Sequence, residues 1–348
     1  MSDTLDLTAL RDYLQGRTPG IGPDLAATRL TGGQSNPSWL LRSGERAWVL
    51  RAKPGPAATL LPSAHAIERE YAVLSALQGT DVPVPGVYAL CEDESVIGAA
   101  FYVMDFADGR IFRDASVPEV DLGQRTAVFD EANRVIAALH CVDVDAVGLG
   151  QYGRRDGFFD RLISRWTRQY RASQTQDLPA MERLIEWLPQ HVPAAAAAAP
   201  VTLTHGDFRL ENLVYHPTEP RVIAVLDWEL STLGSPLSDL AYTCMSWHVP
   251  AGVIRGFADK DYAALGIPSE AAYVRRYCAR TGRDDADQVL ADWPFYLACN
   301  FFRLAAILQG IAKRVLDGIA ASPIAVETSQ MAGPAADIGW HIATSTRT

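Results

Sequence analysis

The sequence predicts an α+β protein of two lobes, with a small β-rich lobe over residues 1–105 and a larger helical lobe over residues 106–348. The chain of 348 residues exceeds the size at which a single hydrophobic core stops growing. Short strand-like runs between glycine-rich turns fill the first lobe, whereas apolar residues recur every three to four positions from about residue 120. A short connector between two such lobes leaves a cleft, which is the usual place for small-molecule chemistry.

The first lobe is expected to contain a few strands and one helix. A glycine-rich turn at 31–36 separates two candidate strands, and the runs SWLLR (38–42) and AWVLRAK (47–53) around a Ser-Gly turn predict a hairpin. Residues 64–77 carry apolar side chains at a spacing of three to four, which makes one face of a helix. The apolar run at 101–104 predicts another strand, and the Asp-Gly turn shortly after it marks the expected connection between the lobes.

The second lobe is expected to be mostly helical around a compact group of strands. Three segments show helical periodicity, at residues 128–140, 158–171 and 181–188. Six alanines between the two prolines of segment 193–200 favour a loop or a short helical spacer. Strand-like runs between residues 201 and 229 are followed by helical patterns over 236–320.

Composition excludes several classes of protein. Thirty-one Lys and Arg against 41 Asp and Glu give a net charge of −10, so neither nucleic acid nor an anionic membrane surface is an expected partner. The N-terminal residues show no signal peptide, and the most apolar stretch, 296–311, is too short and too interrupted by polar residues to span a bilayer. Five scattered cysteines without C-x-x-C spacing predict reduced, mostly buried thiols. We therefore expect a soluble, cytoplasmic protein.

Two short segments carry the chemistry, HGDFRLEN at 205–212 and VLDWE at 225–229. The five-residue step from Asp207 to Asn212 matches the kinase catalytic loop H-R-D-L-x-x-x-N, and Asp227 ends an apolar strand where the kinase D-F-G aspartate would lie. Phosphoryl transfer needs hard oxygen ligands for a divalent metal and a base for the acceptor hydroxyl. Asn212 and Asp227 can supply the ligands and Asp207 the base. Ordinary turn or cap roles for these residues stay as the alternative.

Four phrases in this order resemble the aminoglycoside phosphotransferase-like kinases, also called the phosphotransferase enzyme family: GGQSNPSWLL, LPSAHAIEREYAVL, HGDFRLENLV and VLDWELSTLGSPLSDLAY. They look most like the branch attached to, or encoded near, acyl-CoA dehydrogenases. The resemblance covers nearly the whole chain and implies a protein-kinase-like fold, with a nucleotide-binding N-terminal lobe and a catalytic, acceptor-binding C-terminal lobe. It also implies ATP and Mg²⁺ as cofactors and a functional association with an acyl-CoA dehydrogenase.

The same resemblance assigns roles in the second lobe. Asp207 matches the catalytic aspartate, and Asn212 and Asp227 match the metal ligands. Arg209 stands where many protein kinases carry a lysine near the γ-phosphate, and we predict the same catalytic role for it. His205 is expected to orient the catalytic loop.

Three further expectations concern residues around the loop. Asp239 looks like the structural aspartate that ties the catalytic loop down. D-F-G has become Asp-Trp-Glu at 227–229, which argues against a switch driven by a phenylalanine. The tryptophans are expected to pack in the core, with Trp39 and Trp247 kept as alternative lining of an acceptor pocket.

Nucleotide-binding residues are expected in the first lobe. Kinases place a lysine in a V-A-I-K strand, where it grips phosphates and pairs with a helix glutamate, a position that Glu70 matches. Aligning W-V-L-R puts Arg51 in the lysine position, with Lys53 two residues later on the same strand face, and the sequence leaves open which one holds phosphate. The other candidates belong to the glycine-rich turn and to the hinge expected at the adenine edge: Gly33, Gln34, Ser35, Asn36, Met104, Asp105 and Ala107.

These features together predict an ATP- and Mg²⁺-dependent small-molecule kinase that phosphorylates a substrate hydroxyl. The branch resemblance points to a hydroxy acid or a hydroxyacyl thioester as the acceptor. An aminoglycoside O-phosphotransferase is one alternative, because the net charge of −10 permits a polycationic acceptor. A catalytically inactive, kinase-shaped nucleotide-binding module is the other. The sequence leaves open the acceptor, the choice between ATP and GTP, and the oligomeric state.

Overall fold

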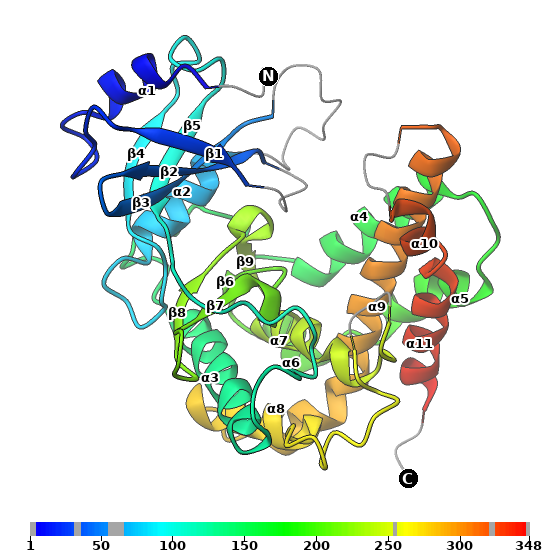
Figure 1. Ribbon diagram of the computed structural model, residues 1–348. Helices are drawn as coiled ribbons and strands as arrows, with labels where there is room; N and C mark the ends of the chain where they lie inside the picture. Colours follow the sequence, from blue (N-terminus) through cyan, green and yellow to red (C-terminus); the bar gives the residue numbers. More distant parts are fainter. Residues whose placement is uncertain (1–4, 31–35, 55–65, 253–255, 320–323, 346–348) are drawn as a thin grey trace.

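The computed structural model describes residues 5–30, 36–54, 66–252, 256–319 and 324–345, and it has the β-rich and helical parts that the sequence predicts (Figure 1). The N-terminal part is an antiparallel sheet of five strands in the order β1-β2-β3-β5-β4. Its strands are β1 (Ala26–Arg29), β2 (Ser38–Ser43), β3 (Arg46–Ala52), β4 (Val87–Cys91) and β5 (Phe101–Asp105). Two helices accompany the sheet, α1 (Leu7–Leu14) and α2 (Ile67–Ala76).

The predicted hairpin is confirmed, and its register decides which way each side chain of β3 points. Ser38 of β2 lies opposite Arg51 of β3. Because side chains alternate along a strand, Leu50 enters a core on the outer face of the sheet, whereas Val49 joins the core shared with the other lobe. Trp39 belongs to the outer core and is 3% exposed, so its alternative role in an acceptor pocket is wrong.

The C-terminal part packs helices around two small strand pairs (Figure 1). Its helices are α3 (Leu122–His140), α4 (Phe158–Ser173), α5 (Pro179–Trp187), α6 (Ala194–Ala198), α7 (Pro236–Cys244), α8 (Glu270–Arg280), α9 (Ala286–Leu316), α10 (Ala325–Ser329) and α11 (Ala332–Thr344). The strand pairs join β6 (Thr202–Thr204) to β9 (Thr232–Gly234), and β7 (Leu213–Tyr215) to β8 (Val222–Val225). The alanine run thus forms the short helical spacer that was one of its two expected structures.

Helix α9 is the centre of this part and packs against α4, α5, α7, α8, α10 and α11. It extends well beyond the predicted apolar stretch because the helix continues through Pro294. Length and composition alone would allow α9 to cross a membrane, but 72% of its most apolar window is buried within the protein, as in the core helix of a globular protein. Four of the five cysteines are buried as predicted, and Cys141 is exposed. The cytoplasmic location stays a prediction.

The two lobes share one large core, which extends from Val49 and Ile67 to the C-terminal helices. The connection runs through Gly109, where an added Cβ would lie 2.2 Å from the Tyr215 carbonyl oxygen, so only glycine permits this close approach. The next residue, Arg110, pairs with Tyr215 in an isolated bridge. The connection between the lobes is therefore held directly against β7, the strand that follows the catalytic loop. The boundary at residue 105 stays a prediction.

Candidate active site

Helix α7 holds the start of the catalytic loop, as expected for Asp239. The two carboxylate oxygens of Asp239 accept hydrogen bonds from the backbone N–H groups of His205 (2.7 Å) and Gly206 (2.8 Å). His140 Nε2 lies 3.2 Å from the same carboxylate. Burial raises the pKa of Asp239, but the hydrogen bond and charge of His140 and the His205 contacts outweigh it, so this pKa lies below its ordinary value. The prediction that Asp239 ties the loop down is confirmed.

Replacing Asp239 with Asn is expected to destabilise the protein by about 1–3 kcal/mol, because an amide cannot accept from both N–H donors. The pKa of Asp239 is lowered in the folded state, so its stabilising contribution is present above the unfolded pKa of about 3.9 and is lost as the pH falls through the folded value. Urea unfolding between pH 3 and pH 7 should show a flatter acid limb in Asp239→Asn. Asp156→Asn, at an exposed position, serves as control. An equal loss of unfolding free energy in the two variants would show that Asp239 does not hold the catalytic loop.

His205 links the catalytic loop to the end of β8. Its Nδ1 accepts from the backbone N–H of Asp207 (3.2 Å), and its Nε2 donates to the carbonyl oxygen of Leu226 (2.9 Å). These partners determine the tautomer. The ring also packs on Trp228, with centroids 4.7 Å apart. The contacts agree with the expected orienting function, and buried Trp228 replaces the phenylalanine of D-F-G as a packing residue.

Three side chains surround the Asp207 carboxylate. Asn212 Nδ2 donates to Oδ2 (3.0 Å) and to the Asp207 backbone carbonyl (2.8 Å). The Tyr242 hydroxyl donates to Oδ1 (2.5 Å), and Arg209 Nε lies 3.3 Å from the same oxygen. The sequence analysis missed Tyr242. Its position three residues after Asp239 puts both on one helix face, which was the available signal.

Asn212 and Asp227 lie at neighbouring ends of β7 and β8. Leu213 pairs with Val225, and the Leu226 N–H donates to the Asn212 carbonyl (2.8 Å). Asp227 adopts a left-handed backbone conformation with φ 67°, which costs a non-glycine residue roughly 1 kcal/mol or more. Since Nδ2 of Asn212 is committed to Asp207, its Oδ1 is the atom left for a cation.

A magnesium ion would suit this pair of oxygen donors, because Mg²⁺ is usually bound through few protein ligands together with substrate phosphates and water. Among the residues that the structure describes, no group of three or more His, Cys, Asp or Glu side chains could hold a metal ion. A site of one amide and one carboxylate is therefore the arrangement to test.

Arg51 and Lys53 have different partners. The Arg51 guanidinium lies 2.9 Å from Glu70 Oε2 and donates to Asp227 Oδ1 at 2.8 Å, whereas Lys53 pairs with Glu68. Burial raises the pKa of Glu70, although the Arg51 charge opposes the effect. Arg51 therefore joins the helix glutamate of the first lobe to the candidate metal ligand of the second. Of the two cations, Arg51 takes the place expected of the strand lysine.

The other nucleotide-site candidates are placed less directly. Gly33, Gln34 and Ser35 lie outside the described residues. Asn36 is buried, and its amide donates to Glu70 (2.8 Å), so its side chain braces the glutamate.

The hinge candidates lie at and just beyond the end of β5. Met104 is buried. The Asp105 carboxylate accepts from the Tyr88 hydroxyl (2.5 Å) and from the Gly86 N–H (3.2 Å), which turns this side chain toward β4. The contact of the backbone around Asp105 and Ala107 with the adenine edge stays a prediction.

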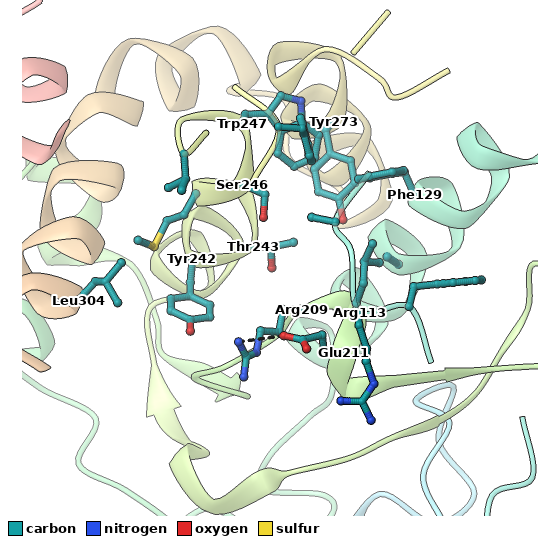
Figure 2. Close-up of a pocket in the computed structure, with 17 residues that line it drawn as sticks. Arg113, Phe129, Arg209, Glu211, Tyr242, Thr243, Ser246, Trp247, Tyr273 and Leu304 are labelled. Carbon is teal, nitrogen blue, oxygen red and sulfur yellow. Dashed lines mark ion pairs between the residues drawn. The ribbon is translucent and has the colours of Figure 1, made fainter. Parts of the chain in front are cut away.

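Two pockets flank the catalytic loop in the C-terminal lobe. The first has a volume of about 150 Å³ and is mostly apolar. Figure 2 shows Arg209 and Glu211, an ion pair of 3.1 Å, on one side of it and Trp247 and Tyr273 on the opposite side. Trp247 therefore lines a pocket near the catalytic loop, and its alternative role in an acceptor pocket stays a prediction. Tyr242 lines the same pocket and contacts Asp207.

The second pocket, of about 280 Å³, lies between α4, α9 and the strand pair β6–β9. Gly206, the residue before Asp207, contributes to its lining. Its φ is +83°, and an added Cβ would meet the Leu230 carbonyl oxygen at 2.7 Å, so glycine is needed at this turn. Both pockets thus border the segment that carries Asp207.

A small sheet with a strand cation paired to a helix glutamate, set against a helical lobe with this Asp-Asn loop, defines the protein-kinase-like class of phosphotransferases. The chain belongs to the phosphotransferase enzyme family, whose model matches residues 26–291. The predicted family is therefore confirmed. This chain is 45% identical over 340 residues to acyl-CoA dehydrogenase family member 10 of Mus musculus, and the match covers 97% of this chain and 31% of that protein. The chain spans less than half the length of such curated relatives.

Solved structures of related proteins have the same fold. A candidate aminoglycoside phosphotransferase of Ralstonia eutropha JMP134 is 50% identical, with a TM-score of 0.89, over 99% of this chain and 100% of that one. The aminoglycoside phosphotransferase APH(4)-Ia, solved with AMP-PNP and hygromycin B, has a TM-score of 0.61 at 17% identity, over 97% of this chain and 100% of that one, and shows the fold alone. The predicted fold class is confirmed.

Proposed function

We propose that the protein is an ATP- and Mg²⁺-dependent kinase that phosphorylates the hydroxyl group of a hydroxy acid or a hydroxyacyl thioester. The observation that carries this proposal is the Asp207 carboxylate, which Asn212 and Tyr242 hold in one orientation beside two pockets. Asp227 lies next to Asn212, on the adjoining strand end. The closeness of base, amide and carboxylate supports the proposal, because phosphoryl transfer needs a base and oxygen ligands near one another.

The side chains of this site would act mainly by positioning. Asp207 would accept the proton of the acceptor hydroxyl while the hydroxyl oxygen forms a bond to the γ-phosphorus. The bond between the γ-phosphorus and the ADP leaving group breaks in the same step. Arg209, beside Asp207, would place its positive charge near the transferred group. Asn212 Oδ1 and the Asp227 carboxylate would hold Mg²⁺, which neutralises phosphate charge when bound. Arg51 would contact the phosphates from the first lobe.

Nucleotide use is supported by a neighbour of the same fold, which was solved with AMP-PNP. For the acceptor, the similarity to an acyl-CoA dehydrogenase family member favours an acyl compound and an association with such a dehydrogenase. The apolar lining of the first pocket suits an alkyl chain. An aminoglycoside would need carboxylates, and the one carboxylate among the residues of that pocket, Glu211, already pairs with Arg209.

A coupled ADP-release screen tests this function. The panel holds hydroxy acids, hydroxyacyl thioesters, aminoglycosides and amino alcohols, each with Mg²⁺-ATP. Acceptor-dependent ADP release with the first two classes is expected. Release only with aminoglycosides would establish the alternative acceptor. Nucleotide binding in a thermal-shift assay without turnover of any alcohol would identify an inactive nucleotide-binding module instead.

Tyr242→Phe is expected to lower kcat about tenfold and to leave the KM for ATP unchanged. The substitution removes the donor to Asp207 Oδ1, and hydrogen bonds to charged groups contribute about 1.5–3 kcal/mol. The phenyl ring keeps the packing of Tyr242. Steady-state kinetics of ADP release measure the effect, and a variant with unchanged kcat would show that Asp207 needs no support from α7.

A further inference from the structure

The second pocket is rich in arginine, although the protein as a whole is acidic. Arg161 and Arg165, one turn apart on α4, and Arg303 on α9 all line it. We call this set of three residues and the space between them the arginine pocket. An electropositive cavity in a chain of net charge −10 needs a local explanation.

The arginine pocket brings like charges together. The Arg165 guanidinium lies 5.5 Å from the ring centroid of Trp166, and that of Arg303 lies 5.9 Å from the same ring. The indole therefore lies close to two guanidinium groups that both line the pocket. An anion in that space would be attracted to both charges.

Nearby acidic groups neutralise the arginine pocket only weakly. Asp239 is the acidic residue in its lining, and the oxygens of Asp239 are occupied by two backbone N–H groups and His140. Arg161 lies 3.6 Å from Asp156, whose side chain is 94% exposed, so water screens that pair. Arg161 also donates to the backbone carbonyl of Arg154 (3.2 Å), which leaves its charge in place. Arg161 and Arg165 thus line the pocket with positive charge that acidic side chains neutralise little.

Arg303 connects the arginine pocket to the catalytic loop. Its Nη2 donates to the Gly206 carbonyl oxygen (2.8 Å), and its guanidinium lies 5.3 Å from the ring centroid of Tyr242, the residue that holds Asp207. Its Nε is buried and has no hydrogen-bond partner among the described residues. A buried donor without an acceptor is unfavourable, and a bound anionic oxygen would supply one.

We propose that the arginine pocket is the binding site for the anionic oxygen group of the acceptor, with Arg161 and Arg165 as its specificity-determining residues. That group is the carboxylate of a free hydroxy acid or a phosphate of its coenzyme A thioester. The inference rests on the proposed function and adds the place and the charge of acceptor recognition. A polycationic acceptor is repelled from the same place.

The kinetic test compares Arg161→Gln/Arg165→Gln with Arg168→Gln, an exposed arginine of the same helix outside the pocket lining. Acceptors are a hydroxy acid, its coenzyme A thioester and its neutral methyl ester. The double variant should raise KM about tenfold for a charged acceptor, with kcat and the KM for ATP retained. The methyl ester and the control variant should show no change. An effect confined to the acid identifies the carboxylate, and one confined to the thioester identifies phosphate. Unchanged KM for both charged acceptors overturns the proposal.

A binding measurement separates this proposal from the function itself. Isothermal titration calorimetry uses acids and thioesters that lack the hydroxyl group and therefore cannot be phosphorylated. Binding to the wild-type protein that weakens about tenfold in the double variant supports the arginine pocket, even if no acceptor is ever turned over. Turnover by the wild-type protein with equal ligand binding in both proteins would overturn the pocket and leave the kinase function standing.

Discussion

Asp207→Asn is expected to lower kcat by about 10²–10⁴-fold, the range that a positioned general base contributes. The amide keeps the shape of the carboxylate and can still contact Tyr242 or Asn212, but it cannot take the proton of the acceptor hydroxyl. Binding of Mg²⁺-ATP should persist, because the expected metal ligands, Asn212 and Asp227, are unchanged. The loss should therefore appear in turnover and not in nucleotide affinity.

Acceptor-dependent ADP release measures this loss, and calorimetric titration with Mg²⁺-AMP-PNP checks nucleotide binding. Glu219→Gln is the matched control, since it also removes one carboxylate from the same lobe at an exposed position. This control variant should release ADP at the wild-type rate. Full acceptor-dependent turnover in Asp207→Asn would remove Asp207 from the role of base and, with it, the main support for the kinase function.

Arg51→Met is expected to destabilise the protein by about 3–5 kcal/mol, the cost of removing one partner of a buried ion pair. The Arg51 side chain is 13% exposed and that of Glu70 is 3% exposed, so Glu70 would be left as an uncompensated buried carboxylate. Asp227 would lose the same partner. Urea unfolding at pH 7 measures the loss, and the Mg²⁺-nucleotide affinity should fall in parallel.

Two further variants sharpen this test. Lys53→Met changes the cation two residues further on the same strand face. Loss of its partly exposed ion pair with Glu68 should lower the free energy of unfolding by about 1 kcal/mol or less. Arg51→Met/Glu70→Gln should recover much of the stability, because the second substitution removes the stranded charge. If Lys53→Met weakened nucleotide binding and Arg51→Met did not, Lys53 would be the phosphate contact.

The elements predicted from the sequence were those with a local signal. The hairpin of β2 and β3 has alternation and a glycine turn, and the catalytic loop has a five-residue step from Asp207 to Asn212. Such signals depend on backbone periodicity and on residue type, which need no knowledge of distant neighbours. Helix α9 extends beyond the apolar stretch 296–311 and continues through Pro294, because packing on six other helices keeps the segment helical.

The contacts that define the site have no such local signal. Arg51 and Asp227 are far apart in the sequence, and the packing of α2 against residues 228–230 brings them together. In that arrangement Arg51 pairs with Glu70 and Asp227, whereas Lys53 pairs with Glu68. Tyr242 contacts the Asp207 carboxylate because Asp239 fixes α7 beneath the loop. Trp39 and Trp247 are the same residue type, but one fills the outer core of the sheet and the other lines a pocket.

The sequence by itself determined the two-lobed α+β fold through the periodicity of its strands and helices, and the residues able to serve as base and metal ligands through their spacing and side-chain chemistry. It determined the family through the four phrases that resemble that family. Only the tertiary structure decided which strand cation faces the metal ligand, which tyrosine holds the base and where the arginines of α4 and α9 gather around one cavity. The physical reason is that electrostatic and hydrogen-bond partners act over a few ångströms in space, and folding brings together groups that lie far apart along the chain.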